Sequence, residues 1–200
     1  MCNEFQQRIA WEAYLDLMAS LDIGVPMIQT ELDLPAADSI RITEPAAVLR
    51  VAGNGMALSP AKFGFPPRGK GGPVFNFRSE GREFRDSERC LIPMSAFYEY
   101  KGTKSPKAKY QFTPKEDQWM AIAGLWKTIG GQDFFTMLTT DPGPDIEPIH
   151  DRQIVVVTPK RFGDWLYDAN GELLAPAPAG TFDVELIRRG KDWPPEGELF

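Results

Sequence analysis

The chain has 200 residues, which suits one domain spanning 1–200 with a core large enough to fold without disulfide bonds. Hydrophobic residues make up 42% and charged residues 25%, as in globular proteins, and no apolar run reaches the roughly 18 residues of a membrane span. The net charge of −6 gives no global support for nucleic-acid binding, although a local basic patch would suffice. Two cysteines cannot form a disulfide framework, so we expect a cytoplasmic protein with free thiols. Two cysteines and one histidine are too few for a zinc site, and we expect neither metal nor cofactor.

The first third of the chain predicts one helix and two strands. Apolar residues at helical spacing indicate an amphipathic helix over 9–21, which begins close enough to Cys2 that the N-terminus is expected to pack against the body. Residues 24–45 carry prolines and glycines among polar residues and are predicted to be a long connection. Residues 46–53 and 56–65 are predicted strands that flank a Gly-Asn-Gly turn.

The rest of the chain predicts a series of short strands. Residues 76–89 are polar and expected to be partly helical, 101–109 form a basic hairpin loop, 159–168 form a short helix, and the tail 190–200 is expected to be loosely held. The predicted strands are 90–93, 97–100, 110–114, 119–128, 134–141, 153–158 and 181–187. This pattern predicts an α+β fold with a mostly antiparallel, barrel-like sheet and a few flanking helices.

Cys2 is the first residue whose position suggests chemistry. If Met1 is removed, Cys2 carries a free α-amine and a thiol, and both groups have usable nucleophilic fractions near neutral pH. Such an aminothiol forms a Schiff base with an aldehyde, and the sulfur then closes a thiazolidine ring. The alternative is that cysteine follows the start methionine by chance.

Two titratable residues are candidates for acid–base catalysis. His150 is the sole histidine and lies just before a predicted strand; it is either an acid–base group or a structural histidine. Asp151 is not expected to orient it, because adjacent side chains on a strand point apart. Glu99 shares a strand face with Phe97, so its carboxyl group could have a raised pKa, but from the residues alone a solvent-facing glutamate is favoured.

The segment after the glycine-rich loop has polar residues at every second position. Asn76, Arg78 and Glu80 would share one face, either as a solvated edge strand or as a polar floor with Arg78 directed at an anion. Cys90 has apolar neighbours and is predicted to be a buried structural thiol.

Several motifs in order resemble one known family. The initial MC, then NFRSEG, RCLIPMSAFYEY, AGLW, FTMLTTDP, IHDR and WLYD, resemble the SOS response-associated peptidase (SRAP) family over roughly residues 2–168. The resemblance implies a compact α+β protein on a curved antiparallel sheet. It also implies binding of single-stranded DNA at an abasic site, autocatalytic removal of Met1, and a thiazolidine crosslink between Cys2 and the open-chain sugar.

The resemblance assigns roles to individual residues. Cys2 would be the nucleophile, Asn76 would hold the Cys2 amine or the sugar, Glu99 would shuttle protons, and His150 would assist acid–base steps and crosslink reversal. Asn3 and Glu4 follow Cys2 where the family has Gly-Arg. The residues expected to contact DNA are Arg78 and Arg152 at phosphates, Phe63 and Phe65 in place of the family's tryptophans, and Arg68 and Lys70 in the glycine-rich loop.

The sequence therefore predicts a monomeric abasic-site sensor of the SOS response, an autopeptidase with lyase-like thiol chemistry whose partner is single-stranded DNA. One alternative is a cysteine hydrolase or peptidase in which Cys2 is the nucleophile and His150 the base. Another is a non-catalytic SRAP domain that only binds single-stranded nucleic acid or a protein partner.

Overall fold

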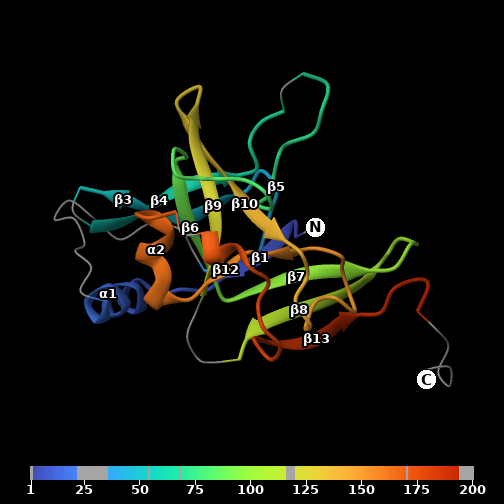
Figure 1. Ribbon diagram of the computed structural model, residues 1–200. Coiled ribbons are helices and arrows are strands. Elements are labelled where there is room, and N and C mark those ends of the chain that lie inside the picture. Colours follow the sequence, from blue (N-terminus) through green and yellow to red (C-terminus); the bar gives the residue numbers. More distant parts are fainter. Residues whose placement is uncertain are drawn as a thin grey trace.

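A computed structural model describes residues 2–21, 36–53, 55–67, 69–115, 120–169 and 171–193 (Figure 1). The helical elements are α1 (Trp11–Ser20), α2 (Phe162–Leu166) and the 3-10 turns η1 (Pro159–Arg161) and η2 (Gly171–Leu174). The strands are β1 (Glu4–Gln7), β2 (Ala37–Arg41), β3 (Pro45–Ala52), β4 (Gly55–Phe63), β5 (Asn76–Arg78), β6 (Arg89–Met94), β7 (Ala96–Lys101), β8 (Ala108–Pro114), β9 (Met120–Ile129), β10 (Gln132–Thr140), β11 (Gln153–Ile154), β12 (Val156–Val157) and β13 (Phe182–Arg188). In the described part of the chain, no helix is long and apolar enough to cross a bilayer.

Five strands close into a barrel. Antiparallel pairs join β4 to β3, β3 to β6, β6 to β9 and β9 to β10, and a parallel pair between β10 and β4 completes the ring. The short strand β5 adds to β10 in parallel, so that Asn76 lies opposite Met137. The predicted α+β fold with a barrel-like, mostly antiparallel sheet is confirmed.

A second sheet packs against the barrel. Its strand order is β13-β8-β7-β1-β2, and every neighbouring pair is antiparallel. Phe5 on β1 and Phe97 on β7 belong to the same buried cluster as the barrel residues Phe63 and Phe135. The rings of Phe5 and Phe63 meet edge to face with centroids 5.8 Å apart. The two sheets therefore share one core, which holds β1 and the N-terminus against the barrel, as the sequence predicts.

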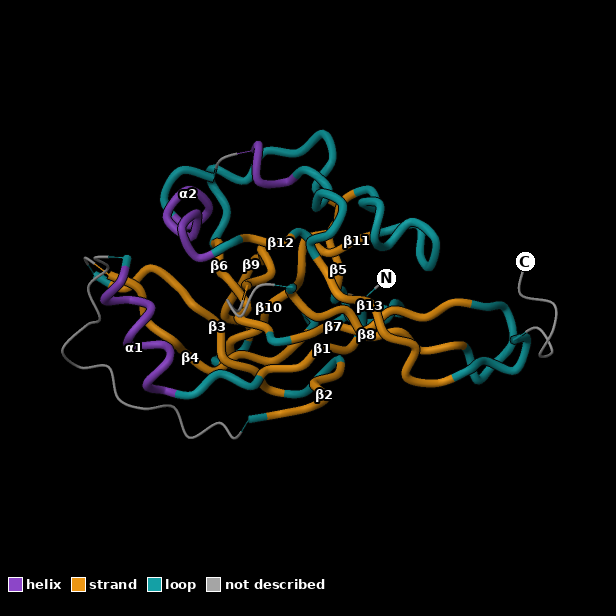
Figure 2. Tube along the Cα trace, turned by 90° about the horizontal axis from the view of Figure 1, so that it is seen from below, coloured by secondary structure: helices purple, strands orange, loops and turns teal. Residues whose placement is uncertain are grey.

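The helices lie beside barrel strands, α1 beside β3 and β4 and α2 beside β6 (Figure 2). Tyr14 and Met18 of α1 are buried in a second cluster, and the Tyr14 hydroxyl donates to the Met56 carbonyl at 2.9 Å. Trp165 of α2 is fully buried, and its indole N–H donates to the Cys90 carbonyl at 2.9 Å. The Arg89 guanidinium donates to the last carbonyls of α2, where a cation is favoured. Cys90 is buried and unbridged, as predicted.

Four local predictions differ from the structure. The region 76–89 contains β5 followed by turns and no helix, because β5 pairs with the edge of β10. The predicted connection 24–45 contains β2, which pairs with β1; residues 22–35 lie outside the described residues. The strand 153–158 is divided into β11 and β12, because one half pairs with β10 and the other with β9. Lys191 and Asp192 are hydrogen-bonded to the hairpin between β7 and β8, unlike a loosely held tail; residues 194–200 lie outside the described residues.

Candidate functional site

The first strand of the second sheet positions Cys2. Cys2 lies just before β1 with 1% of its surface exposed, and its thiol donates to the Glu4 carbonyl at 3.4 Å. Burial raises the pKa of the Cys2 thiol, and the negative charge of Glu99 raises it further. The thiol is therefore held in its protonated form at neutral pH in this conformation.

Asn76 is hydrogen-bonded to the backbone of Cys2. Its Nδ2 donates a hydrogen bond of 2.8 Å to the Cys2 carbonyl, across 74 positions of sequence. Its Oδ1 is buried and accepts no hydrogen bond within the described part of the chain. The parallel pairing of β5 with β10 fixes Asn76 in place, so the added strand brings an amide to the N-terminal residue.

Glu99 lies in β7, next to β1 in the second sheet. Its side chain is 1% exposed, and Phe97 two positions earlier is fully buried. Desolvation by burial raises the pKa of Glu99 to about 7. The expectation of a solvent-facing glutamate is wrong, because both faces of β7 are covered over residues 96–99. A carboxyl group with this pKa both donates and accepts protons near neutral pH.

His150 faces Glu99 from a turn. Its Nε2 lies 3.7 Å from Glu99 Oε2, and the Arg152 backbone N–H donates to its Nδ1 at 3.0 Å. In the neutral ring the proton is therefore on Nε2, directed toward Glu99. Burial lowers the pKa of His150, and the positive charge of Lys107 adds to this effect.

Asp151 also contacts the imidazole. Its Oδ1 lies 3.1 Å from His150 Nδ1, and its negative charge opposes the fall in the His150 pKa. The expectation that Asp151 points away is wrong, because it assumed a strand. The His150 N–H instead donates to the Ile146 carbonyl at 2.9 Å, and residues 144–149 form a turn, so the alternation of side chains along a strand does not apply here.

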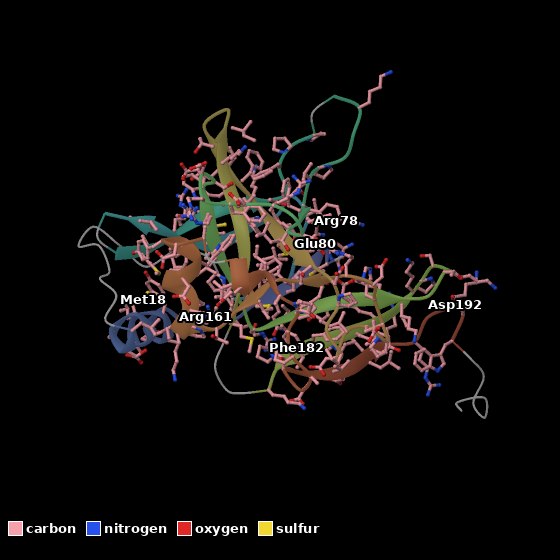
Figure 3. All side chains as sticks on the ribbon, viewed as in Figure 1. Met18, Arg78, Glu80, Arg161, Phe182 and Asp192 are labelled. Carbon is pink, nitrogen blue, oxygen red and sulfur yellow. The ribbon has the colours of Figure 1, made fainter. Side chains whose placement is uncertain are left out.

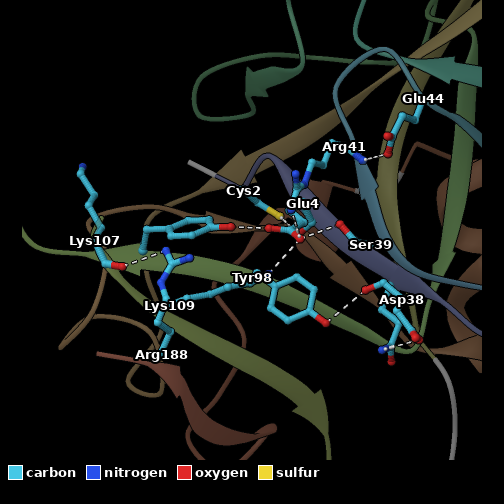
Figure 4. A network of polar contacts seen from close by, with 12 residues as sticks. Cys2, Glu4, Asp38, Ser39, Arg41, Glu44, Tyr98, Lys107, Lys109 and Arg188 are labelled. Atoms are coloured by element: carbon cyan, nitrogen blue, oxygen red, sulfur yellow. Dashed lines mark hydrogen bonds and ion pairs between the residues drawn. The ribbon is translucent and has the colours of Figure 1, made fainter. Parts of the chain in front are cut away.

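A buried carboxylate lies beside Cys2 (Figure 4). The Glu4 side chain is 2% exposed, and it accepts hydrogen bonds from Lys109 Nζ at 2.8 Å, Ser39 Oγ at 2.6 Å, Arg41 Nη2 at 3.4 Å and the Tyr100 hydroxyl. Burial opposes ionisation of Glu4, but the hydrogen bonds, led by that from Lys109, outweigh it and lower its pKa to about 2. Glu4 is thus ionised, and it ties β1 to β2, β7 and β8.

The Glu4 cluster also borders a cavity of about 240 Å³, lined by Asn3, Glu4, Arg41, Ile42 and Tyr100. The sequence marked Glu4 only as an acid in place of the family's arginine. Glu4 follows Cys2 by two residues, and in an extended chain such residues face the same way. This spacing is the signal that could have placed Glu4 on the same face as Cys2.

The predicted DNA-contact residues fall into two groups, of which the first lies at the surface. Arg78 is exposed at the end of β5, in the same region as Glu80 (Figure 3). Lys70 is exposed in the glycine-rich loop, and Phe65 is partly buried, with a backbone bridge to Val74. Arg68 lies outside the described residues.

The second group is buried and differs from the expectation of DNA contact. Phe63 has no exposed surface and stacks on Phe135 with ring centroids 5.1 Å apart, so it packs the core and does not reach a base in this conformation. Arg152 is 7% exposed, and its guanidinium is bonded to the carboxylates of Glu80 and Asp141. These partners replace the phosphate that was expected at Arg152.

Within the described ranges, the structure has no group of three or more His, Cys, Asp or Glu side chains placed to hold a metal ion. The site instead brings together a thiol, an amide, a carboxyl group of raised pKa and an imidazole from four separate segments. Such a set suits proton transfer around a carbonyl addition at Cys2.

Comparison with known proteins gives relatives by sequence and by fold. Two Bacillus subtilis proteins named "Abasic site processing protein", YoqW and YobE, are 37% and 36% identical over 46% and 42% of this chain. The matches cover 45% and 41% of those proteins, so the chain spans less than half the length of the curated relatives it matches. A crystal structure of a Bordetella bronchiseptica protein has the same fold, with a TM-score of 0.73 at 22% identity over 94% of this chain and 100% of that one.

The family itself follows from a match over nearly the whole sequence. The family described as SOS response associated peptidase (SRAP) matches residues 1–187 of the 200. The matched range includes all four segments that form the site around Cys2. This chain therefore belongs to the SRAP family.

Proposed function

We propose that this protein recognises an abasic site in single-stranded DNA and crosslinks to it through Cys2 after Met1 is removed. The name of the relatives, "Abasic site processing protein", supports an abasic site as the substrate. The observation that carries the proposal is the convergence on Cys2: Asn76 bonds its carbonyl at 2.8 Å, and Glu99, beside it, lies 3.7 Å from His150.

The proposed chemistry needs neither metal nor redox partner. Hydrolysis of the Met1–Cys2 peptide bond consumes one water and frees the α-amine. The amine adds to the aldehyde carbon of the open-chain sugar, and loss of water gives an imine. The thiol sulfur then adds to the imine carbon while its proton passes to the nitrogen, which closes a thiazolidine ring. The sum of the last two steps is aldehyde plus aminothiol giving thiazolidine plus water.

Glu99 is the proposed proton shuttle. With a pKa of about 7, its carboxylate form takes the proton from the Cys2 α-ammonium, which frees the neutral amine to attack, and its acid form donates a proton to the hydroxyl that leaves as water. His150 presents Nε2–H toward Glu99 and supports the carboxylate form when it forms. Asn76 holds the Cys2 carbonyl, and its Oδ1 is positioned to accept from the freed amine.

Burial of the thiol supports the order of these steps. The raised pKa of the Cys2 thiol suppresses thiolate, so the amine is the better first nucleophile and the thiol adds second. The same property disfavours a cysteine hydrolase, which needs a thiolate for its first attack.

Surface residues of β5 and of the glycine-rich loop are proposed to hold the strand. Arg78 and Lys70 are exposed and suit phosphate contacts, and the partly buried ring of Phe65 is the aromatic side chain proposed to stack beside the lesion.

The test is a crosslinking assay on a single-stranded oligonucleotide with one abasic site. The wild-type protein is expected to give a heat-resistant adduct without reductant, and Cys90→Ala, the control, is expected to behave identically. Cys2→Ala keeps an amine but lacks the thiol, so it should give an adduct only when borohydride reduces the imine. No adduct from the wild-type protein under either condition would contradict the proposal and favour a domain that only binds nucleic acid or protein.

A further inference from the structure

A cluster of cations lies at the end of the second sheet where β7 and β13 end and β8 begins. It has no part in the proposed chemistry. It consists of residues 101–109, which are the end of β7, the turn and the start of β8, and of residues 188–192, which are the last residue of β13 and the four residues after it. We call these two segments the basic arm. In Figures 1 and 2 the arm projects away from the barrel in both views. Its exposed cations are Lys101, Lys104, Lys107, Arg188, Arg189 and Lys191.

The two segments are fastened to each other. The Asp192 carboxylate accepts from the Thr103 backbone N–H at 2.7 Å and the Lys104 N–H at 3.3 Å, and the Lys191 N–H donates to the Pro106 carbonyl at 2.8 Å. A side chain at Gly190 would come within 2.5 Å of the Ala108 backbone nitrogen, so the segments touch at the main chain. The two segments of the arm therefore form one ordered unit. Asp192, whose carboxylate joins them, is labelled in Figure 3.

Charge is distributed very unevenly between the arm and the rest of the chain. The arm holds seven of the 22 basic residues and one of the 28 acidic residues. The remainder therefore carries 15 basic and 27 acidic residues, a net charge of −12. Among the described residues, the ammonium groups of Lys101, Lys104, Lys107 and Lys191 form no ion pair. A positive platform on an otherwise acidic protein selects a polyanionic partner.

The arm begins at the candidate site. Lys101 follows Glu99 by two residues on β7, about 7 Å at the rise of a strand. The charge of Lys107 also reaches His150, whose pKa it lowers together with burial, the larger cause. An anionic chain that occupies the site can thus continue directly along the arm.

We infer that the basic arm binds the phosphodiester backbone of the DNA strand on one side of the lesion, an inference that rests on the proposed function. From Glu99 to Lys101 the end of β7 spans roughly 7 Å, the length of roughly two stacked nucleotides at about 3.4 Å each, and the arm continues beyond β7 through Lys104 and Lys107. The contacts are to phosphates, so the arm adds affinity without base preference.

The test compares the wild-type protein with Lys104→Gln/Lys107→Gln/Lys191→Gln, whose backbone contacts within the arm are unchanged. Binding of an undamaged single strand of about 25 nucleotides is measured against salt concentration by fluorescence anisotropy. Loss of three cations should make the slope of log K against log salt shallower by about 2, with about a tenfold or greater loss of affinity near physiological salt. The exposed lysines of the triple variant Lys62→Gln/Lys127→Gln/Lys160→Gln lie outside the arm, and this control should keep the wild-type slope.

Crosslinking rates on strands of different length show on which side of the lesion, 5′ or 3′, the arm binds the DNA. Abasic oligonucleotides carry an extension of about ten nucleotides on the 5′ side only or on the 3′ side only, or about two nucleotides on each side. The arm variant should crosslink more slowly than wild type on one extended strand and equally on the short one. The charge-preserving variant Lys104→Arg/Lys107→Arg/Lys191→Arg should restore the rate, which separates charge from folding.

The outcomes for the arm and for the chemistry are separable. A wild-type salt slope in the arm variant, or binding of anionic phospholipid vesicles but not of the oligonucleotide, would overturn the arm's role. Absence of any crosslink in the wild-type protein would overturn the proposed function, while the undamaged-strand measurement would still decide whether the arm binds DNA.

Discussion

At the scale of single residues, Glu99 controls the charge state of the site. Its pKa rises from 4.5 to about 7 because burial disfavours the carboxylate. The folded state therefore binds a proton more tightly than the unfolded state, and stability falls as the pH rises through this interval. Integrated over the shift, the loss is about 3 kcal/mol between about pH 4.5 and pH 7.

Glu99→Gln should remove this pH dependence. We expect urea unfolding to show a variant that is more stable than wild type near pH 8 by about 3 kcal/mol and similar near pH 4.5. The exposed Glu83→Gln is the control and should follow the wild-type curve. Because the shuttle is lost, Glu99→Gln should also crosslink at least about 100-fold more slowly. Parallel pH curves for Glu99→Gln and wild type would contradict the buried position of this carboxyl group.

Asn76 provides a second test at the same scale. Asn76→Ala removes the 2.8 Å hydrogen bond to the Cys2 carbonyl and should lower the free energy of unfolding by about 1 kcal/mol. The crosslinking rate should fall more, by about tenfold to 100-fold, because the nucleophile loses its position. Asn76→Asp keeps the shape but replaces the donor with an acceptor, so it should crosslink no faster than Asn76→Ala. Equal rates for the wild-type protein and Asn76→Asp in single-turnover assays would contradict this role.

The sequence indicated Cys2, Asn76, Glu99 and His150 as residues, but not all of their surroundings. Period-two alternation correctly placed Glu99 on the face of the buried Phe97. The contact of Asp151 with His150 was missed because it depends on a turn, and the partners of Glu4 were missed because they come from β2, β7 and β8.

At the scale of elements, β1 follows directly after Cys2, the proposed nucleophile, and Glu4 anchors this strand. Glu4→Gln removes the charge that pairs with Lys109, whose side chain is 16% exposed, and should lower the free energy of unfolding near pH 7 by about 3 kcal/mol. The pKa of Glu4 is lowered to about 2, so its contribution is present above about pH 4.5 and is lost as the pH falls toward 2.

The matched control is Glu44→Gln, because the Glu44 carboxylate is exposed and accepts a hydrogen bond from the Arg41 N–H only three residues away. The measurement is urea unfolding of both variants near pH 7 and near pH 3. If Glu4→Gln were as stable as Glu44→Gln near pH 7, the Glu4 cluster would not be the anchor of β1.

The barrel strand β9 gives a test of packing. A methyl group at Gly124 would lie 2.7 Å from the Thr136 carbonyl oxygen and 2.5 Å from Ile92 Cδ1, so Gly124→Ala forces β6, β9 and β10 apart. We expect a loss of about 2–3 kcal/mol in thermal or urea unfolding. Gly171→Ala is the control, since nothing lies within 4 Å of its added methyl group. Equal stability of the two variants would show that the barrel at Gly124 is looser than described.

The positions of the strands could be predicted from the sequence more readily than the partner that each strand pairs with. The hairpin of β3 and β4 and the strands β6 to β10 fall close to the predicted ranges, because alternation and turn residues are local signals. The division of 153–158 into β11 and β12 depends on which barrel strand each half meets, and no local pattern encodes that choice.

At the scale of the whole molecule, Cys2, the proposed nucleophile, lies where two sheets share one core. The second sheet supplies Cys2 and Glu99, the strand added to the barrel supplies Asn76, and a turn before β11 supplies His150. Composition and periodicity predicted a mostly antiparallel, barrel-like sheet, but the closure of the barrel by the parallel pair β4–β10 is a long-range pairing that sequence alone did not specify. The same closure explains why Phe63 packs the core.

The most direct test of the central claim is the intact mass of the protein before and after incubation with a single-stranded oligonucleotide that contains one abasic site. The account predicts a protein that lacks Met1, and then an adduct whose mass is the sum of protein and oligonucleotide less one water, absent in Cys2→Ala. A protein that retains Met1 yet forms the same adduct, or one that loses Met1 and forms none, would contradict the account.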